Sequence, residues 1–270
     1  MTEPLPRRLV MTSLMTGLTL ATVRVDAQVI HTDTAGLDVG EAMTTVPTYY
    51  ARPQGNGPFP IVLVNEEVFG VTDYIKDVCR RLARVGYLAV APEIYARLVD
   101  TAKLTSEAEV QAVVGKAPDA TVMSDLDAAM AWAAANKGDA SRAGVTGFCR
   151  GGRNTWLYDA HSTTVKAAVV WYGVLGGART EIQPRTAADM ATEIHAPLLA
   201  LQGGQDRSIS VADLQAAAAR ARAAGKTVEV VVYPDAGHGF HADYRPSYRP
   251  ADAADGWQRM LAWFRRWGVA

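Results

Sequence analysis

Cys149 lies at the centre of a Gly-Phe-Cys-Arg-Gly-Gly turn that spans residues 147–152. The residues before it, 142–147, read as a short buried strand, and residues 151–161 can form a helix. A G-x-C-x-G turn between a strand and a helix lifts the sulfur above the sheet, where the helix dipole and free N–H groups favour a thiolate. The pattern predicts a cysteine nucleophile; the alternative is a small buried cysteine in a glycine-rich turn.

Two later strand ends supply the partners that such a nucleophile needs. The strand-like run 196–203 is followed by Asp206, and the run 227–233 is followed by His238 in a Gly-His-Gly-Phe loop. This chain order of nucleophile, acid and histidine is the usual one for a nucleophile on a strand-to-helix turn. Because the carboxyl ends of parallel strands meet at one edge of a sheet, we expect Cys149, Asp206 and His238 to form a catalytic triad.

Other histidines and carboxylates have weaker claims on these roles. His241 is close to His238 in the sequence and is expected to line the pocket. Asp235 and Asp243 flank the histidine loop and remain alternatives to Asp206 as the acid. The remaining histidines are expected to be structural: His31, His161 and His195.

The elements that must position these residues are strands that alternate with amphipathic helices. This alternation predicts an α/β fold, with a mainly parallel central sheet and helices on both faces. The clearest helices are expected over residues 72–86, 119–137, 211–225 and 251–267. Residues 101–117 contain no clear strand and are expected to form an irregular or helical insertion near the site. With 270 residues, of which 49% are apolar, the chain is long enough to bury one sizeable core.

Composition and motifs narrow the possible partners to a small molecule. The net charge of −1 and the lack of a basic run argue against nucleic acid. The sequence has no H-E-x-x-H motif and no Cys/His cluster with ligand spacing, so neither a metal nor another cofactor is expected. Cys79 and Cys149 are expected to be free thiols, because a disulfide between them would disable the nucleophile. The protein is expected to be a monomer or a small homo-oligomer.

The N-terminal segment resembles a twin-arginine export signal. Arg7-Arg8 precedes an apolar run over residues 9–21, and a Val-Asp-Ala cleavage site follows. The apolar run is too short and too rich in threonine for a stable membrane span. We therefore expect a signal over residues 1–27, one domain over residues 28–270 and a periplasmic protein. A cytoplasmic protein with a loose N-terminal extension is the alternative.

From Val46 to the C-terminus, the chain resembles the dienelactone hydrolase family, the cysteine branch of the α/β-hydrolases. Besides the triad, the resemblance rests on Glu-Val-Phe-Gly at residues 67–70, Tyr-Ala-Arg at residues 95–97 and Trp-Tyr-Gly-Val at residues 171–174. It implies the α/β-hydrolase fold and an activity on lactones or carboxylic esters.

The resemblance also implies roles for individual residues. Glu67 is similar to the glutamate that contacts the resting thiol and helps it lose its proton. Arg97 with Tyr95 resembles the pair that holds the carboxylate of an acidic lactone. The backbone N–H groups of Val68 and Arg150 are the implied oxyanion hole. The other residues expected at the substrate site are Phe69, Trp171, Tyr172, Phe240, His241 and Arg245.

The chain departs from the family pattern at three places. A second glutamate, Glu66, competes for the role of its neighbour. Arg150 replaces the usual large apolar residue after the nucleophile, where its guanidinium can lower the thiol pKa or pair with a glutamate. At the position where the family has its second carboxylate-binding arginine, this chain has Ala242. This leaves Arg245 or Arg249 to replace that arginine.

Together these residues predict a hydrolase that cleaves a lactone or carboxylic ester through a thioester on Cys149. A broad short-chain esterase or thioesterase is the alternative within the same chemistry. Two other classes remain open. One is a non-enzymatic binding protein on this scaffold, which would give no reason for a triad. The other is a thiol-redox protein, for which a C-x-x-C pair is missing.

Overall fold

The computed structural model describes residues 14–15, 18–19, 33–99, 101, 104 and 106–270. Most of the predicted signal segment, and His31, therefore lie outside the described residues. Two short strands near the N-terminus, β1 (Leu14–Met15) and β2 (Leu18–Thr19), pair with each other as a separate sheet. No helix in the described part of the chain combines the length and the apolar character that crossing a membrane requires.

The centre of the molecule is an eight-stranded sheet in the order β10-β9-β8-β7-β5-β6-β4-β3. The strands from β10 to β6 run parallel to one another, whereas β4 and β3 continue the sheet as an antiparallel edge. The strands are β3 (Leu37–Met43), β4 (Pro47–Pro53), β5 (Phe59–Asn65), β6 (Leu88–Pro92), β7 (Gly138–Phe148), β8 (Ala167–Trp171), β9 (Leu198–Gly203) and β10 (Val228–Tyr233).

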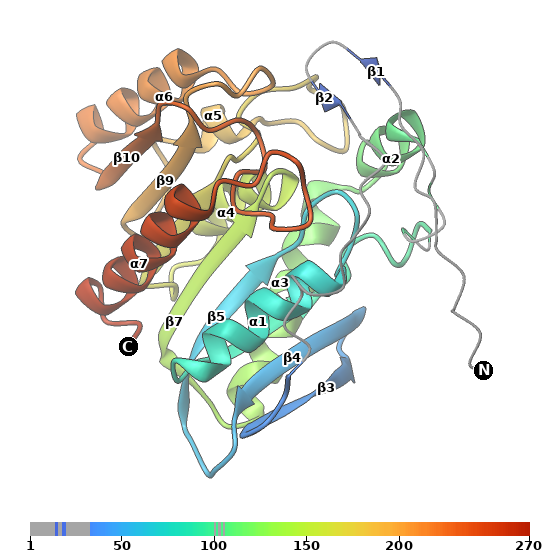
Figure 1. The fold of residues 1–270 in the computed structure, drawn as a ribbon, viewed down its shortest axis with the longest axis vertical. Helices are drawn as coiled ribbons and strands as arrows, with labels where there is room; N and C mark the ends of the chain where they lie inside the picture. The colour runs from blue at the N-terminus through green and yellow to red at the C-terminus, as the bar shows by residue number, and fades with distance from the viewer. Residues whose placement is uncertain (1–13, 16–17, 20–32, 100, 102–103, 105) are drawn as a thin grey trace, which may run out of the picture.

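Helices cover both faces of this sheet, with α1 and α7 in front of it in the view of Figure 1. α3, α4 and α6 pack on the opposite face together with the short helices α2 and α5. The helices are α1 (Asp73–Arg84), α2 (Glu107–Val114), α3 (Asp119–Ala135), α4 (Arg150–His161), α5 (Ala187–Met190), α6 (Val211–Ala223) and α7 (Pro250–Arg266). Because both faces are covered, β6, β8 and β9 are buried along their whole length, which explains their almost continuous apolar sequences.

The predicted α/β-hydrolase architecture is confirmed, and the antiparallel edge formed by β4 and β3 is an addition to it. No strand was expected over β3, whose residues are mostly half-buried or exposed and mix polar with apolar types. The segment 101–117 contains α2, which begins with a capping box between Ser106 and Glu109. The ends of β7, β9 and β10 lie at the same edge of the sheet because these strands are parallel, and the predicted catalytic residues follow them there.

Candidate active site

Cys149 forms the turn between β7 and α4. Its backbone has φ 55° and ψ −113°, a conformation that residues other than glycine rarely adopt. The Cys149 N–H donates to the Trp171 carbonyl at 3.0 Å, and the Cys149 carbonyl accepts from the N–H groups of Gly152 and Val174. These hydrogen bonds hold the strained residue from both sides. The side chain stays partly exposed at the N-terminus of α4.

The turn depends on glycine at Gly147 and Gly151. A Cβ on Gly147 would lie 2.2 Å from the carbonyl oxygen of Gly151. A Cβ on Gly151 would lie 2.3 Å from the carbonyl oxygens of both Asn65 and Glu66. Because these neighbours are backbone atoms, no side-chain rotation can relieve the clash, so the G-x-C-x-G spacing is a packing requirement.

Asp206 and His238 face each other from the ends of β9 and β10. The Nδ1 atom of His238 lies 2.8 Å from Oδ2 of Asp206. Oδ1 of Asp206 accepts from the N–H groups of Ser208 and Ile209, and Oδ2 also accepts from Gln202. Burial disfavours the ionised carboxyl, but His238 and these donors outweigh it and hold the pKa of Asp206 below its usual range. With Asp206 ionised, Nδ1 of His238 carries a proton and Nε2 is left for another partner.

That other partner is Cys149. Burial alone would lower the pKa of His238, but the charge and hydrogen bond of Cys149, together with Asp206, raise it to about 10. The three side chains predicted to form a triad are thus brought together from three strand ends. The arrangement places the Cys149 thiol beside an imidazole that Asp206 orients.

The alternatives to these residues have other contacts. His161 is exposed on α4, with Nε2 2.8 Å from Asp127. Asp243 accepts from Arg81 at 2.7 Å, and Asp235 is exposed on the loop before His238. None of these contacts involves Cys149.

Glu67 is buried in a polar cluster with Tyr244 and Arg245. Its side chain is 1% exposed, and it accepts from the Tyr244 hydroxyl at 2.6 Å and from the Arg245 guanidinium at 3.1 Å. Burial alone would lower the pKa of Arg245. The interactions with Glu67 and Tyr244 are stronger than this effect and raise the pKa of Arg245 well above its usual value. In place of the expected contact with the resting thiol, Glu67 hydrogen-bonds to these two partners.

Glu66 points to a different place. Its Oε1 accepts from the backbone N–H of Ile94 at 3.0 Å, and the side chain is fully buried. Burial, together with the nearby Glu93, raises the pKa of Glu66 well above its usual range. Of the two adjacent glutamates, Glu67 is therefore the one that faces the loop of Tyr244 and Arg245.

Arg150 extends from the first turn of α4 toward Gln183 and Tyr95. Its Nη2 donates to Gln183 Oε1 at 2.9 Å, and its guanidinium also interacts with the buried Tyr95 side chain. Burial lowers the pKa of Arg150. The predicted pairing of Arg150 with a glutamate is not found among the described residues.

Arg97 differs from its predicted place at the substrate site. Its guanidinium binds Asp125 through Nε at 3.2 Å and Nη2 at 2.8 Å, and it also donates to the Thr45 carbonyl. Asp125 is only 2% exposed, so its buried carboxylate requires a cationic partner. Tyr95 interacts with Arg150 and Asn154 rather than with Arg97. The expected Arg97–Tyr95 pair is therefore not formed.

Three of the residues expected at the substrate site belong to the core instead. Trp171 and Phe240 are fully buried and pack together, with ring centroids 6.0 Å apart. His241 is 2% exposed; its Nδ1 lies 2.7 Å from the Tyr74 hydroxyl, and its ring stacks on Trp257. The large apolar area of these rings explains why they pack inward.

Two further aromatic residues, Tyr172 and Phe69, lie beside the polar side chains of the candidate site. Tyr172 is fully buried, and its ring meets the His238 ring edge-on at 5.1 Å. Phe69 is half-buried under the guanidinium of Arg245, which lies 5.4 Å from its ring centroid. Tyr172 thus packs against His238, and Phe69 packs against Arg245 of the Glu67 cluster.

The predicted oxyanion hole is compatible with the backbone. Arg150 is the first residue of α4, where helical N–H groups have no partner within the helix. Val68 lies in the loop directly after β5, at the same edge of the sheet. In the part of the chain that the structure describes, neither N–H donates to a backbone carbonyl outside helices and strands.

Two contacting residues, Tyr244 and Gln183, were not singled out from the sequence. Tyr244 lies 177 residues from its partner Glu67, and Gln183 lies 33 residues from Arg150. No local sequence pattern indicates contacts over such distances along the chain. Within the described residues, no group of three or more His, Cys, Asp or Glu side chains could hold a metal ion.

Comparison with known proteins gives one consistent family. The sequence profile of the dienelactone hydrolase family matches residues 46–268. A protein of Methylorubrum extorquens, provisionally named carboxymethylenebutenolidase, is 53% identical over 98% of this chain and 94% of its own length. An Escherichia coli K12 protein with the same provisional name is 50% identical over 83% of each chain. A crystal structure from Klebsiella pneumoniae, provisionally described as a dienelactone hydrolase, has a TM-score of 0.83 at 47% identity and covers 85% of this chain and 99% of its own.

Proposed function

Because the chain belongs to the dienelactone hydrolase family, it is a hydrolase of lactones or carboxylic esters, and we propose that it works through a Cys149–His238–Asp206 triad. The observation that carries the proposal is the contact of His238 with Cys149 on one side and Asp206 on the other. The elbow conformation of Cys149 supports it further.

In the proposed first step, the Cys149 thiolate attacks the carbonyl carbon of the lactone or ester. The carbonyl oxygen becomes an oxyanion, which the N–H groups of Val68 and Arg150 can bind. The tetrahedral intermediate then expels the alkoxide or enolate oxygen of the substrate. The imidazolium of His238 gives this oxygen a proton, and the acyl group remains on sulfur as a thioester.

In the second step, His238 takes a proton from a water molecule as that water attacks the thioester carbon. The intermediate expels the Cys149 thiolate and releases a carboxylic acid, and His238 again carries the proton. Asp206 keeps Nδ1 of His238 protonated throughout, so that Nε2 faces the reaction. We propose that Glu67, held by Tyr244 and Arg245, supports the charge balance next to the thiol.

The test is hydrolysis of dienelactone beside p-nitrophenyl acetate, with Cys149→Ala as the subtraction control. We expect hydrolysis that depends on Cys149 and a clear preference for the lactone, because a ring ester held by the site leaves as an enolate. Activity on the simple ester alone would favour a broad short-chain esterase. Activity that persists in Cys149→Ala would overturn the proposed nucleophile.

A further inference from the structure

The loop after β5, residues 66–72, is tied to the segment after β6 by two glutamates. This loop, the oxyanion loop, carries one of the two N–H donors of the proposed oxyanion hole. At its start, Oε1 of Glu66 accepts from the backbone N–H of Ile94 at 3.0 Å. Near its end, the backbone N–H of Val71 donates to Oε2 of Glu93 at 2.9 Å. Each carboxyl group therefore belongs to one segment and binds the backbone of the other.

The oxyanion loop is also packed closely against its neighbours on both sides. The carbonyl oxygen of Glu66 lies 2.3 Å from the place that a Cβ on Gly151 would take, in the nucleophile turn. A Cβ on Gly70, whose φ is +82°, would lie 2.2 Å from Oε1 of Glu93. The two glutamates thus contact the loop before and after Val68, so they determine where the Val68 N–H lies relative to the nucleophile.

The surroundings of Glu66 disfavour its ionised form. Its side chain is fully buried, and Oε2 has no hydrogen-bond partner. The titratable groups that face it are the carboxyl group of Glu93 and the phenol of Tyr95, which in turn interacts with Arg150. Burial and the charge of Glu93 raise the pKa of Glu66 well above its usual range, although the N–H groups of Ile94 and Tyr95 oppose this shift. A neutral acid keeps Oε1 as an acceptor and avoids a second buried charge beside Glu93.

We propose that Glu66 and Glu93 are positioning residues for the Val68 N–H, and that Glu66 acts as a neutral carboxylic acid. In this role neither glutamate touches the substrate; together they hold the oxyanion loop where its N–H meets the developing oxyanion. A displaced N–H costs more in the transition state than in the bound substrate, because the charge on oxygen forms only as the thiolate attacks. The inference rests on the proposed hydrolase function and adds two residues that act through its oxyanion hole.

The first test compares Glu66→Gln with Glu66→Ala on the preferred ester. The glutamine amide keeps an acceptor for the Ile94 N–H and has a donor in place of the acid proton, so kcat/KM should stay within about threefold of the native value. Alanine leaves the Ile94 N–H without its acceptor, so kcat should fall at least about tenfold while KM changes by less than about twofold. A loss in Glu66→Gln as large as in Glu66→Ala would overturn the neutral form. An unchanged kcat in Glu66→Ala would overturn the positioning role.

Infrared spectroscopy reads the protonation state of Glu66 directly and needs no substrate. In the difference between the native protein and Glu66→Gln at neutral pH, we expect the C=O stretch of a protonated carboxyl group. Bands of an ionised carboxylate in this difference would overturn the neutral form, even if Glu66→Ala fails to fold.

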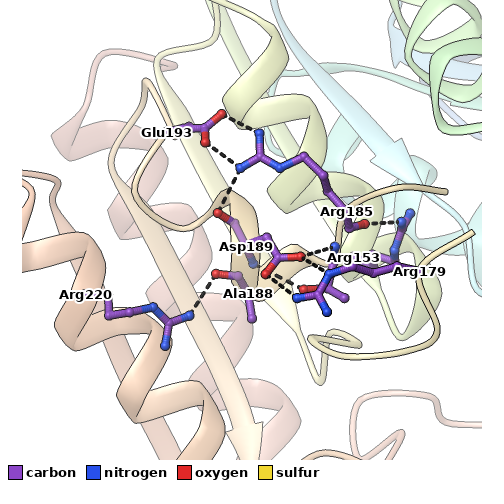
Figure 2. A network of polar contacts seen from close by, with 8 residues as sticks. Arg153, Arg179, Arg185, Ala188, Asp189, Glu193 and Arg220 are labelled. Carbon is purple, nitrogen blue, oxygen red and sulfur yellow. Dashed lines mark hydrogen bonds and ion pairs between the residues drawn. The ribbon is translucent and has the colours of Figure 1, made fainter.

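Glu193→Gln is the matched control for both measurements. Glu193 is exposed just after α5 and pairs with Arg185, as Figure 2 shows, and the hydrogen bond from Arg185 lowers the pKa of Glu193. The difference spectrum of this variant should therefore contain the bands of an ionised carboxylate, and its kcat should equal that of the native protein.

Glu93→Ala tests the second glutamate. It leaves the Val71 N–H without its acceptor and should lower kcat in the same way as Glu66→Ala. Because both glutamates tie one loop, the double variant should lose less than the product of the two single losses. A loss equal to that product would mean that the glutamates act independently, and it would overturn their joint role.

This inference and the proposed triad can fail separately. Hydrolysis that persists in Cys149→Ala, together with the protonated carboxyl band and the loss of kcat in Glu66→Ala, would reject the triad and keep the positioning glutamates. Hydrolysis through Cys149 with an ionised Glu66, or with an unchanged kcat in Glu66→Ala, would reject the inference and keep the triad.

Discussion

At the scale of single residues, the orientation of His238 depends on Asp206. The carboxylate accepts from His238 and from two backbone N–H groups, and these hydrogen bonds hold it in one position. Asp206→Asn keeps the shape of the side chain but no longer favours the tautomer with a proton on Nδ1. We expect kcat/KM on the preferred ester to fall by about 10²- to 10⁴-fold, with little change in the melting temperature.

The chain offers a matched control for this substitution. Asp127 contacts His161 at 2.8 Å in the same way, but on the exposed side of the molecule. Asp127→Asn should therefore leave kcat/KM within about twofold of the native value, because exposed ion pairs contribute little. Equal activities of the two Asp→Asn variants would contradict the role of Asp206.

At the scale of elements, the turn between β7 and α4 tolerates no side chain at Gly151. A Cβ there would meet the carbonyl oxygens of Asn65 and Glu66 at 2.3 Å, and both belong to the β5 segment. We expect Gly151→Ala to lower the free energy of unfolding by about 1–3 kcal/mol or more and to abolish activity, as measured by urea denaturation and ester hydrolysis. Gly176→Ala, where a Cβ would meet nothing within 4 Å, should change neither.

A buried ion pair joins α4 to α3. Arg153 binds Asp119 with two hydrogen bonds, of 2.7 and 2.8 Å, and its side chain is 4% exposed. Arg153→Met leaves Asp119 without its cation, so we expect a loss of about 3–5 kcal/mol in the free energy of unfolding. Arg179→Met breaks the exposed pair with Asp189 and should cost less than about 1 kcal/mol. Similar losses in the two variants would show that the burial of Arg153 does not matter.

At the scale of the whole molecule, His241 should make folding stability depend on pH. Burial, with a smaller effect of Arg81, lowers the pKa of His241 from 6.5 to about 3. Below pH 6.5 the unfolded chain therefore binds a proton that the folded protein does not, and stability falls as the pH falls toward 3. Between pH 7 and pH 5 this one group should remove about 2 kcal/mol from the free energy of unfolding.

His241→Phe tests this contribution, because phenylalanine can keep the stacking on Trp257 but cannot take a proton. The variant loses the hydrogen bond to Tyr74, so its free energy of unfolding at pH 7 should be lower than that of the native protein. The decrease in this free energy between pH 7 and pH 5 should be smaller than in the native protein by about 2 kcal/mol. A His241→Phe slope equal to the native slope would mean that His241 is protonated in the folded protein.

Much of the fold and of the candidate site could be predicted because the relevant signals are local. The alternation of apolar runs with amphipathic stretches reports burial on one face or on both, and this predicted the parallel sheet and its helices. The G-x-C-x-G spacing indicates that other backbone segments approach the turn closely. The surroundings of Gly151 show this close approach in the structure. Strand ends are visible in the sequence, so the placement of Asp206 and His238 beyond β9 and β10 followed from the chain order.

The pairing of charges was decided only by the tertiary structure. Arg97 meets Asp125 from 28 residues away, Arg150 meets Gln183 from 33, and Arg245 meets Glu67 from 178. A sequence reveals that an arginine is present near a strand end, but the partner depends on which buried acceptor lacks a donor once the chain has folded. The same reason applies to His241, whose place in the core rather than the pocket depends on the rings packed around it. The sequence by itself thus determined the class of fold and the candidate chemistry, whereas long-range packing decided which side chains remain free to meet a substrate.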